Sequence, residues 1–177
     1  MTLATAHAVT TFDIAVLILR LTLGGMILAH GMNKLFGGGR IPGTARWFDS
    51  IGMKPGVLNA WAAALTEVGC GVLLIVGLIT PLACAALVAL MVVAIVTVHR
   101  KNGFFVFNAG QGIEYCLMIA LVAIALGGLG AGRWSLDHAF HVWTFAPWIG
   151  LVVAAGVGIG GATLQLLAVY RPPHESA

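Results

Sequence analysis

Five long apolar segments dominate this sequence and set what it can fold into. They cover Phe12–Gly31, Val57–Ile79, Leu82–Val98, Gln111–Gly130 and Phe145–Tyr170. A helix that crosses a bilayer needs about 20 mostly apolar residues, with a range of roughly 17–25. The chain is also 60% hydrophobic and only 8% charged, whereas soluble domains usually carry about 25% charged residues. The sequence therefore predicts an all-α integral membrane protein and excludes a water-soluble domain.

The segments are separated by polar stretches too short to form a soluble domain, so we expect a single membrane domain over residues 1–177. The second and third segments meet at Thr80 and Pro81. Because proline has no backbone N–H, this junction predicts a tight helical hairpin. The first segment lacks a basic start and contains Asp13 and Arg20. We therefore expect it to be retained rather than cleaved as a signal peptide.

Lysine and arginine in the connections predict the orientation. Seven of these cations fall on one side of the predicted membrane and only Arg133 falls on the other. The seven are Lys34, Arg40, Arg46, Lys54, Arg100, Lys101 and Arg171. The positive-inside rule then places the amino terminus outside and the carboxyl terminus in the cytoplasm of a multi-pass plasma (inner) membrane protein. This bias accounts for most of the net charge of +3, and we expect no nucleic-acid partner.

The connection after the first segment contains a short amphipathic stretch over residues 43–53. Its apolar side chains Trp47, Phe48 and Ile51 are predicted to face the membrane. Its polar side chains Arg46, Asp49 and Ser50 are predicted to face water. This pattern is typical of a short helix in the membrane interface.

Three ionisable residues lie within the apolar segments: Arg20, Glu67 and Glu114. A charge at the centre of the bilayer costs roughly 2.5–3.5 kcal/mol on insertion scales, so it normally faces the bundle interior or a partner. Arg20 and Glu67 are both near the middle of their segments, so we expect them to pair. Small residues on their helical faces favour close packing there. A buried pair that only fixes helix register is the structural alternative.

Further polar residues gather toward the basic side of the membrane. His30 and Lys34 end the first segment, His99 ends the third, and Gln111 with Glu114 begins the fourth. Together they predict a polar funnel that enters the bundle from this side. As alternatives, the two histidines would be interfacial side chains, and Glu114 would stabilise a helix amino terminus.

Other ligand patterns are weaker. Cys70, Cys84 and Cys116 form no CxxC motif, so neither a disulfide relay nor a thiolate metal site is expected. A haem between His30 and His99 is a further alternative. The stretch "GVGIGG" (Gly156–Gly161) fits GxGxxG but lies inside an apolar segment, which excludes a dinucleotide site. Gly156 and Gly160 instead predict a face for helix packing or homo-oligomerisation.

Four motifs resemble the DoxX family: "RLTLGGMILAHGMNKLFGG" (Arg20–Gly38), "ALTEVGCGVLLIVGLIT" (Ala64–Thr80), "HRKNGFFVFNAGQGIEYCLMIALVAIAL" (His99–Leu126) and "GRWSLD" (Gly132–Asp137). The resemblance covers roughly residues 13–137 and implies a four-helix membrane bundle, taken here as residues 12–137. Two features depart from the family pattern. Pro81 stands where many relatives carry a basic residue, and the segment over residues 145–170 adds a fifth transmembrane helix.

The resemblance also implies which positions carry function. The family's first-helix arginine matches Arg20, and its HG-x-x-K-L-F turn matches His30 to Phe36. Its second-helix glutamate matches Glu67, its histidine before the GFF turn matches His99, and its E-Y pair matches Glu114 and Tyr115. Related DoxD-type proteins are tied to thiosulfate:quinone oxidoreduction, and DoxX relatives to membrane complexes that handle redox stress.

Taken together, the sequence favours a redox-linked membrane subunit that binds a quinone or a similar lipophilic molecule in the funnel. In this interpretation Glu67, Glu114 and His99 are the catalytic, proton-exchanging groups, with Arg20 orienting Glu67. The pocket-binding residues are Arg20, His30, Lys34, Gln111 and Tyr115. Two alternatives stay open: a non-catalytic membrane anchor for a soluble redox enzyme, and a transporter of protons or a small solute. A soluble redox enzyme is an expected partner besides the lipid bilayer.

Overall fold

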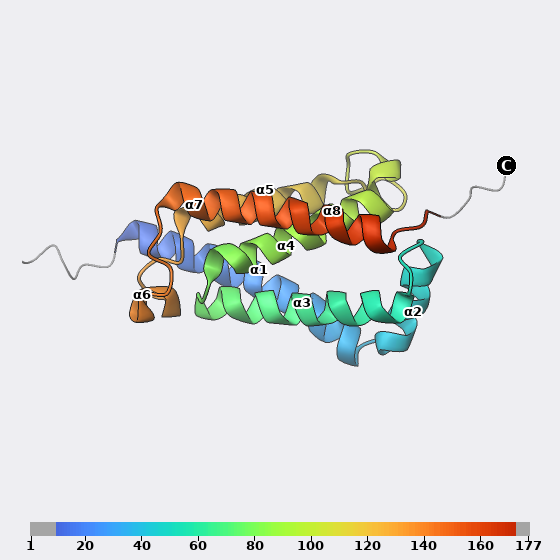
Figure 1. Cartoon of the computed structure of the whole chain (residues 1–177), viewed down its shortest axis with the longest axis horizontal. Coiled ribbons are helices and arrows are strands. Elements are labelled where there is room, and N and C mark those ends of the chain that lie inside the picture. The colour runs from blue at the N-terminus through green and yellow to red at the C-terminus, as the bar shows by residue number, and fades with distance from the viewer. Residues whose placement is uncertain (1–9, 173–177) are drawn as a thin grey trace, which may run out of the picture.

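The computed structural model describes residues 10–172, which form long helices that lie side by side (Figure 1). The order of the longer elements is α1 (Thr11–Phe36), α2 (Arg40–Ser50), α3 (Gly56–Val76), α4 (Thr80–Ala94) and α5 (Glu114–Leu129). After α4 come a π-helical turn, η2 (Ile95–His99), and a 3-10 turn, η3 (Arg100–Asn102). The chain closes with α6 (Leu136–Phe140), α7 (Pro147–Val152), a second π-helical turn, η4 (Val153–Val157), and α8 (Gly158–Val169).

Four helices of the described residues are long and apolar enough to cross a membrane: Thr11–Phe36, Gly56–Val76, Thr80–Asn102 and Pro147–Val169. The all-α membrane fold is thereby confirmed, including the helix beyond residue 137. The predicted segment over residues 111–130 yields the apolar helix α5, which is shorter, with 16 residues. It begins three residues later than predicted because Gln111–Ile113 belong to the loop that precedes it.

The ends of the helices follow from local chemistry. Thr10 caps α1: its hydroxyl oxygen accepts a hydrogen bond from the Asp13 amide, and the Asp13 carboxylate accepts one from the Thr10 amide. This reciprocal arrangement satisfies donors that a helix start leaves unpaired. Helix α3 ends at Gly77, whose φ of 68° suits glycine. Pro81 lies in the first turn of α4, where no amide donor is needed, and the predicted hairpin is confirmed.

Helices α1 and α3 pack closely through glycines. A Cβ atom added to Gly24 would lie 2.8 Å from the carbonyl oxygen of Gly71, and one added to Gly31 would lie 2.8 Å from a Val68 methyl group. Only residues without a side chain permit this approach. The contact therefore fixes the register of the two antiparallel helices, with Gly31 opposite Glu67 and Val68.

Helix α2 departs partly from the predicted interfacial helix. Trp47 is exposed as expected, and so are Arg46, Asp49 and Ser50. Phe48, however, is buried in an apolar cluster with Met53 and Ala60. The prediction that Phe48 faces the membrane is wrong, because the start of α3 folds back over that face of α2 and buries it.

The end of α8 is tied to the loop between α2 and α3. The Lys54 amide donates to the Val169 carbonyl at 2.9 Å, and the Arg171 amide donates to the Gly52 carbonyl at 2.7 Å. These bonds frame an antiparallel bridge between Met53 and Tyr170. The last helix is thus anchored by its backbone to the same end of the bundle as α2 (Figure 1).

Candidate functional site

An ion pair joins α1 and α3 inside the bundle. The Lys34 amino group donates to both carboxylate oxygens of Glu67, each at 2.7 Å. The Glu67 side chain is 9% exposed and the Lys34 side chain 21% exposed. Lys34 lies one helical turn beyond Gly31, so the glycine contact between the helices brings its amino group to Glu67. A largely buried carboxylate is therefore paired, as the cost of burying a charge requires.

A cavity of about 270 Å³ lies beside this ion pair, and we call it the polar cavity because several polar side chains are part of its wall. Six predicted site residues from four parts of the chain line it: His30, Lys34, Glu67, His99, Gln111 and Tyr115. The remaining wall is largely apolar and includes Met91, Cys116 and Ile119. The structure thus gathers these six residues around one space, with the ion pair as its charged wall.

A loop over residues 103–113 closes one side of the polar cavity through Val106, Gln111 and Gly112. The Asn102 side chain donates to the Gly110 and Gln111 carbonyls at 2.7 and 3.0 Å. His99 Nδ1 lies 2.9 Å from the same Gln111 carbonyl. Side chains near the loop therefore hold it in a defined shape over the cavity.

Glu114 belongs to this loop support rather than to the cavity wall. Its carboxylate accepts a hydrogen bond from the Val106 amide at 3.0 Å. Glu114 is also the first residue of α5, where a negative charge is favourable. The structural alternative considered for this residue describes its contacts, and Glu114 is not among the residues that line the polar cavity.

Arg20 lies far from Glu67, so the predicted pair between them is wrong. Gly31 stands opposite Glu67, and Arg20 is eleven positions (31 − 20) earlier on α1, or roughly 16 Å along the axis at 1.5 Å per residue. The Arg20 side chain points to the opposite end of the bundle, where it lies against Gly77. Arg20 therefore neither orients Glu67 nor contributes to the polar cavity.

The Arg20 guanidinium instead binds backbone oxygens. It donates to the carbonyls of Leu74 and Ile75, near the end of α3, at 2.9 and 2.8 Å. It also donates to the carbonyls of Ala131 and Trp134 at 2.6 and 2.8 Å. The residue is 1% exposed. Because the last carbonyls of a helix lack partners within it, Arg20 caps α3 and fastens the loop before α6 to it.

A second space, which we call the apolar groove, lies between α3, α4 and α8 and has a volume of about 550 Å³. Its wall is mainly apolar; alanines such as Ala62 and Ala89 widen it, and Gly161 and Gln165 belong to α8. Ala62 and Gly161 are exposed at the protein surface, so the groove opens toward the surrounding membrane. The sequence did not predict the apolar groove, because alanine and glycine have no polar or charged side-chain group that would mark a binding site.

The polar cavity and the apolar groove share part of their walls. Five residues line both: Lys34, Trp47, Glu67, Met91 and Ala94. We call these five residues the neck. The ion pair therefore stands between a polar space in the bundle and an apolar space open to lipid. Trp47 on α2 and Met91 and Ala94 on α4 were not predicted as site residues, because none of them has a titratable group.

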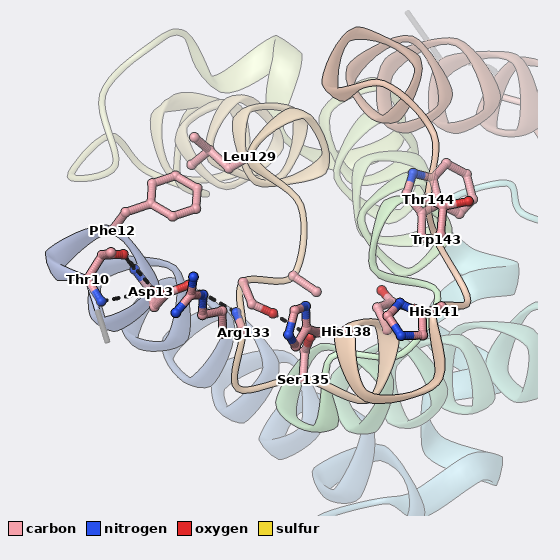
Figure 2. A pocket seen from close by; sticks show the side chains of 13 residues that line it. Thr10, Phe12, Asp13, Leu129, Arg133, Ser135, His138, His141, Trp143 and Thr144 are labelled. Carbon is pink, nitrogen blue, oxygen red and sulfur yellow. Dashed lines mark hydrogen bonds between the residues drawn. The ribbon is translucent and has the colours of Figure 1, made fainter. Parts of the chain in front are cut away.

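A third pocket, of about 540 Å³, lies at the opposite end of the bundle (Figure 2). Figure 2 shows Asp13 between Thr10 and Arg133, and the Asp13 carboxylate accepts a hydrogen bond from the Arg133 amide at 3.0 Å. The Asp137 carboxylate accepts from the Ile79 and Thr80 amides at the start of α4. Both acidic groups therefore serve the backbone here, and the polar cavity is the better candidate site.

Comparisons with known proteins agree with the membrane fold. The family model described as DoxX matches residues 15–100. The chain is 31% identical over 118 residues to "Putative oxidoreductase CatD" of Bacillus subtilis (strain 168), covering 67% of this chain and 82% of the relative. It is also 31% identical over 132 residues to "Uncharacterized membrane protein Rv3486" of Mycobacterium tuberculosis (strain ATCC 25618 / H37Rv), covering 70% and 80%. No solved structure matches.

Proposed function

Because the chain belongs to the DoxX family, we propose that it is a redox-linked membrane subunit that binds a quinone or a similar lipophilic molecule in the polar cavity. The observation that carries this proposal is the Lys34–Glu67 ion pair, which lies between a cavity with titratable walls and an apolar groove. The name of the Bacillus subtilis relative, "Putative oxidoreductase CatD", agrees with a redox role.

The chemistry of a quinone suits this cavity. Reduction to a quinol takes up electrons together with protons, so the site needs groups that donate hydrogen bonds and exchange protons. The Lys34 ammonium is a donor on the wall, and His30, Glu67 and His99 are groups that can exchange protons. The Tyr115 hydroxyl, also on the wall, donates to the Met26 sulfur at 2.6 Å. The cavity has few charged groups and a mostly apolar wall, as sites for small lipophilic ligands usually do.

A soluble redox enzyme would supply the electrons at the end of the bundle that carries α2 and the loop over residues 103–113. Seven of the nine lysines and arginines, all except Arg20 and Arg133, belong to that end or its connections. By the positive-inside rule this end of the bundle faces the cytoplasm of a plasma membrane.

Homo-oligomers would form through Gly156 and Gly160, which are exposed and have open space beside them.

The test begins with the purified protein. Extraction with organic solvent is expected to release about one quinone per chain from the wild type. The variants Glu67→Gln and Lys34→Met are expected to retain less than about a tenth of it, which corresponds to a loss of at least 1.4 kcal/mol.

The matched control is Glu114→Gln, which removes a carboxylate outside the cavity and keeps an oxygen that can accept from Val106. This variant is expected to retain its quinone. A wild-type protein that carries no quinone and binds none when it is added would refute the proposal. A non-catalytic anchor would then be favoured, whereas proton flux in liposomes that Glu67→Gln abolishes would favour a transporter.

A further inference from the structure

We propose that the ligand has a long apolar chain, that this chain lies in the apolar groove, and that α8 forms the outer wall of its binding site. This inference rests on the proposed function and specifies the class of ligand. The fifth helix, which lies beyond the part of the chain matched by the family model, is thereby part of the ligand site.

The polar cavity and the apolar groove are adjacent, because the neck residues, among them Lys34, Glu67 and Met91, line both spaces. A ligand whose polar ring contacts the ion pair from the cavity side therefore has an apolar space directly across the neck. A small polar molecule would need only the cavity of about 270 Å³ and would leave the groove, twice as large at about 550 Å³, without a role.

The wall of the apolar groove suits a hydrocarbon chain. Away from the ion pair, the groove is lined by residues such as Leu58, Ala86, Leu90 and Val93 on α3 and α4. A flexible hydrocarbon chain fits a wall of small and medium apolar side chains, because it makes many dispersion contacts and needs no hydrogen bonds. Polar side chains on the same wall already donate within the protein: Asn59 to the Pro55 carbonyl, Thr97 to the Val93 carbonyl and Gln165 to the Asn59 side chain.

Helix α8 is held against the start of α3 at one end only. Gln165 Nε2 lies 3.4 Å from the Asn59 side-chain oxygen on α3, and the backbone of Val169 accepts from Lys54. These contacts tie the end of α8 to the start of α3. Gly161, one turn earlier on α8, lines the groove, and a Cβ atom there would meet nothing within 4 Å. The two helices thus touch at one end and leave room for a chain beside Gly161.

The open space at Gly161 permits a direct test. The variants Gly161→Ala, Gly161→Leu and Gly161→Phe place side chains of increasing size beside the groove without a clash at Cβ. The matched control is Gly25→Phe on α1, since Gly25 also has open space and is exposed. Thermal unfolding in detergent checks that each variant folds as the wild type does.

Two probes separate the chain from the ring: a benzoquinone without a side chain, and the same benzoquinone with a decyl chain. Binding is followed by quenching of tryptophan fluorescence, because Trp47 lines the neck. We expect Gly161→Phe to weaken binding of the decyl quinone by about tenfold, with Gly161→Leu and Gly161→Ala progressively closer to the wild type. Binding of the quinone without a chain is expected to be unchanged, and Gly25→Phe is expected to bind both as the wild type does.

Three results would overturn the inference. If Gly161→Phe binds the decyl quinone as the wild type does, or weakens both quinones equally, the chain does not lie in the groove. If the substitution instead changes the phospholipid that co-purifies and leaves the binding of both quinones unchanged, a membrane lipid occupies the groove. If neither quinone binds the wild type, the proposed function fails, and this inference fails with it. If both quinones bind the wild type but Gly161→Phe has no selective effect on the decyl quinone, only this inference fails.

Discussion

The Lys34 amino group lies 2.7 Å from each carboxylate oxygen of Glu67, and these two side chains form the charged part of both the polar cavity and the apolar groove. The pair crosses from α1 to α3 at the level where Gly31 lets the helices meet. Its position makes it a structural link and a ligand contact at once. These two roles can be separated by measuring stability and binding on the same variants.

Removing one partner of the pair is expected to cost stability unequally. Lys34→Met leaves the Glu67 carboxylate unpaired at 9% exposure and is expected to cost about 3 kcal/mol. Glu67→Leu leaves Lys34, which at 21% exposure can turn its amino group toward water, and is expected to cost about 1 kcal/mol. The double variant is expected to be more stable than Lys34→Met. Unfolding in detergent measures all three, and additive losses would contradict a direct interaction.

Arg20 is expected to stabilise the fold without affecting the ligand site. Arg20→Lys removes the forked donor that reaches four carbonyls, and an ammonium cannot replace its planar geometry. We expect a loss of about 3 kcal/mol in unfolding free energy, while the quinone content of the folded protein stays at the wild-type level. Arg46→Lys on the exposed side of α2 is the control and is expected to be neutral. Loss of quinone from folded Arg20→Lys protein would contradict this assignment.

The glycine contact between α1 and α3 gives a prediction with a control on the same helix. Gly31→Ala brings a Cβ atom within 2.8 Å of Val68, and such overpacking typically costs 1–3 kcal/mol, so a loss of about 2 kcal/mol is expected. Gly25→Ala, where a Cβ meets nothing within 4 Å, is expected to leave stability unchanged or slightly raised. Thermal unfolding of both variants checks the difference, and equal effects would show that the close approach is not required.

The loop over residues 103–113 is expected to control access to the polar cavity. Cys116 lines this cavity and is buried, so its reaction with a maleimide reports opening when Cys70 and Cys84 are replaced by alanine. Asn102→Ala removes the side chain that donates to Gly110 and Gln111. Losing about 1.4 kcal/mol of hydrogen bonding would raise the labelling rate about tenfold. An unchanged rate would show that other contacts keep the loop closed.

Several features of the fold could be predicted because each depends on short-range patterns. Apolar length predicted the membrane helices, and Pro81 predicted the start of α4. The gathering of His30, Lys34, His99 and Gln111 followed from their shared position at helix ends on one side of the membrane. Side chains that end or begin neighbouring helices on the same side of a small bundle lie within reach of one another, and here two of them, His30 and Gln111, are exposed.

The pairing of Arg20 could not be predicted, because it depends on helix register. Both Arg20 and Glu67 are central in their own segments, but α1 extends to Phe36, beyond the apolar run that ends at Gly31. The glycine contact then aligns Glu67 with the later half of α1. Lys34, a terminal cation by sequence, thereby becomes the partner, and Arg20 is left to bind carbonyls.

The antiparallel bridge between Met53 and Tyr170 joins the turn before α3 to the residue that follows α8. A deletion of the last helix would not simply return the protein to a smaller bundle, since it would expose the amide of Lys54 and the carbonyl of Gly52 and uncover Met53, which is 0% exposed. Shortened versions cut before Pro147 would therefore begin to fray at the turn ahead of α3, 92 positions upstream of the cut (147 − 55).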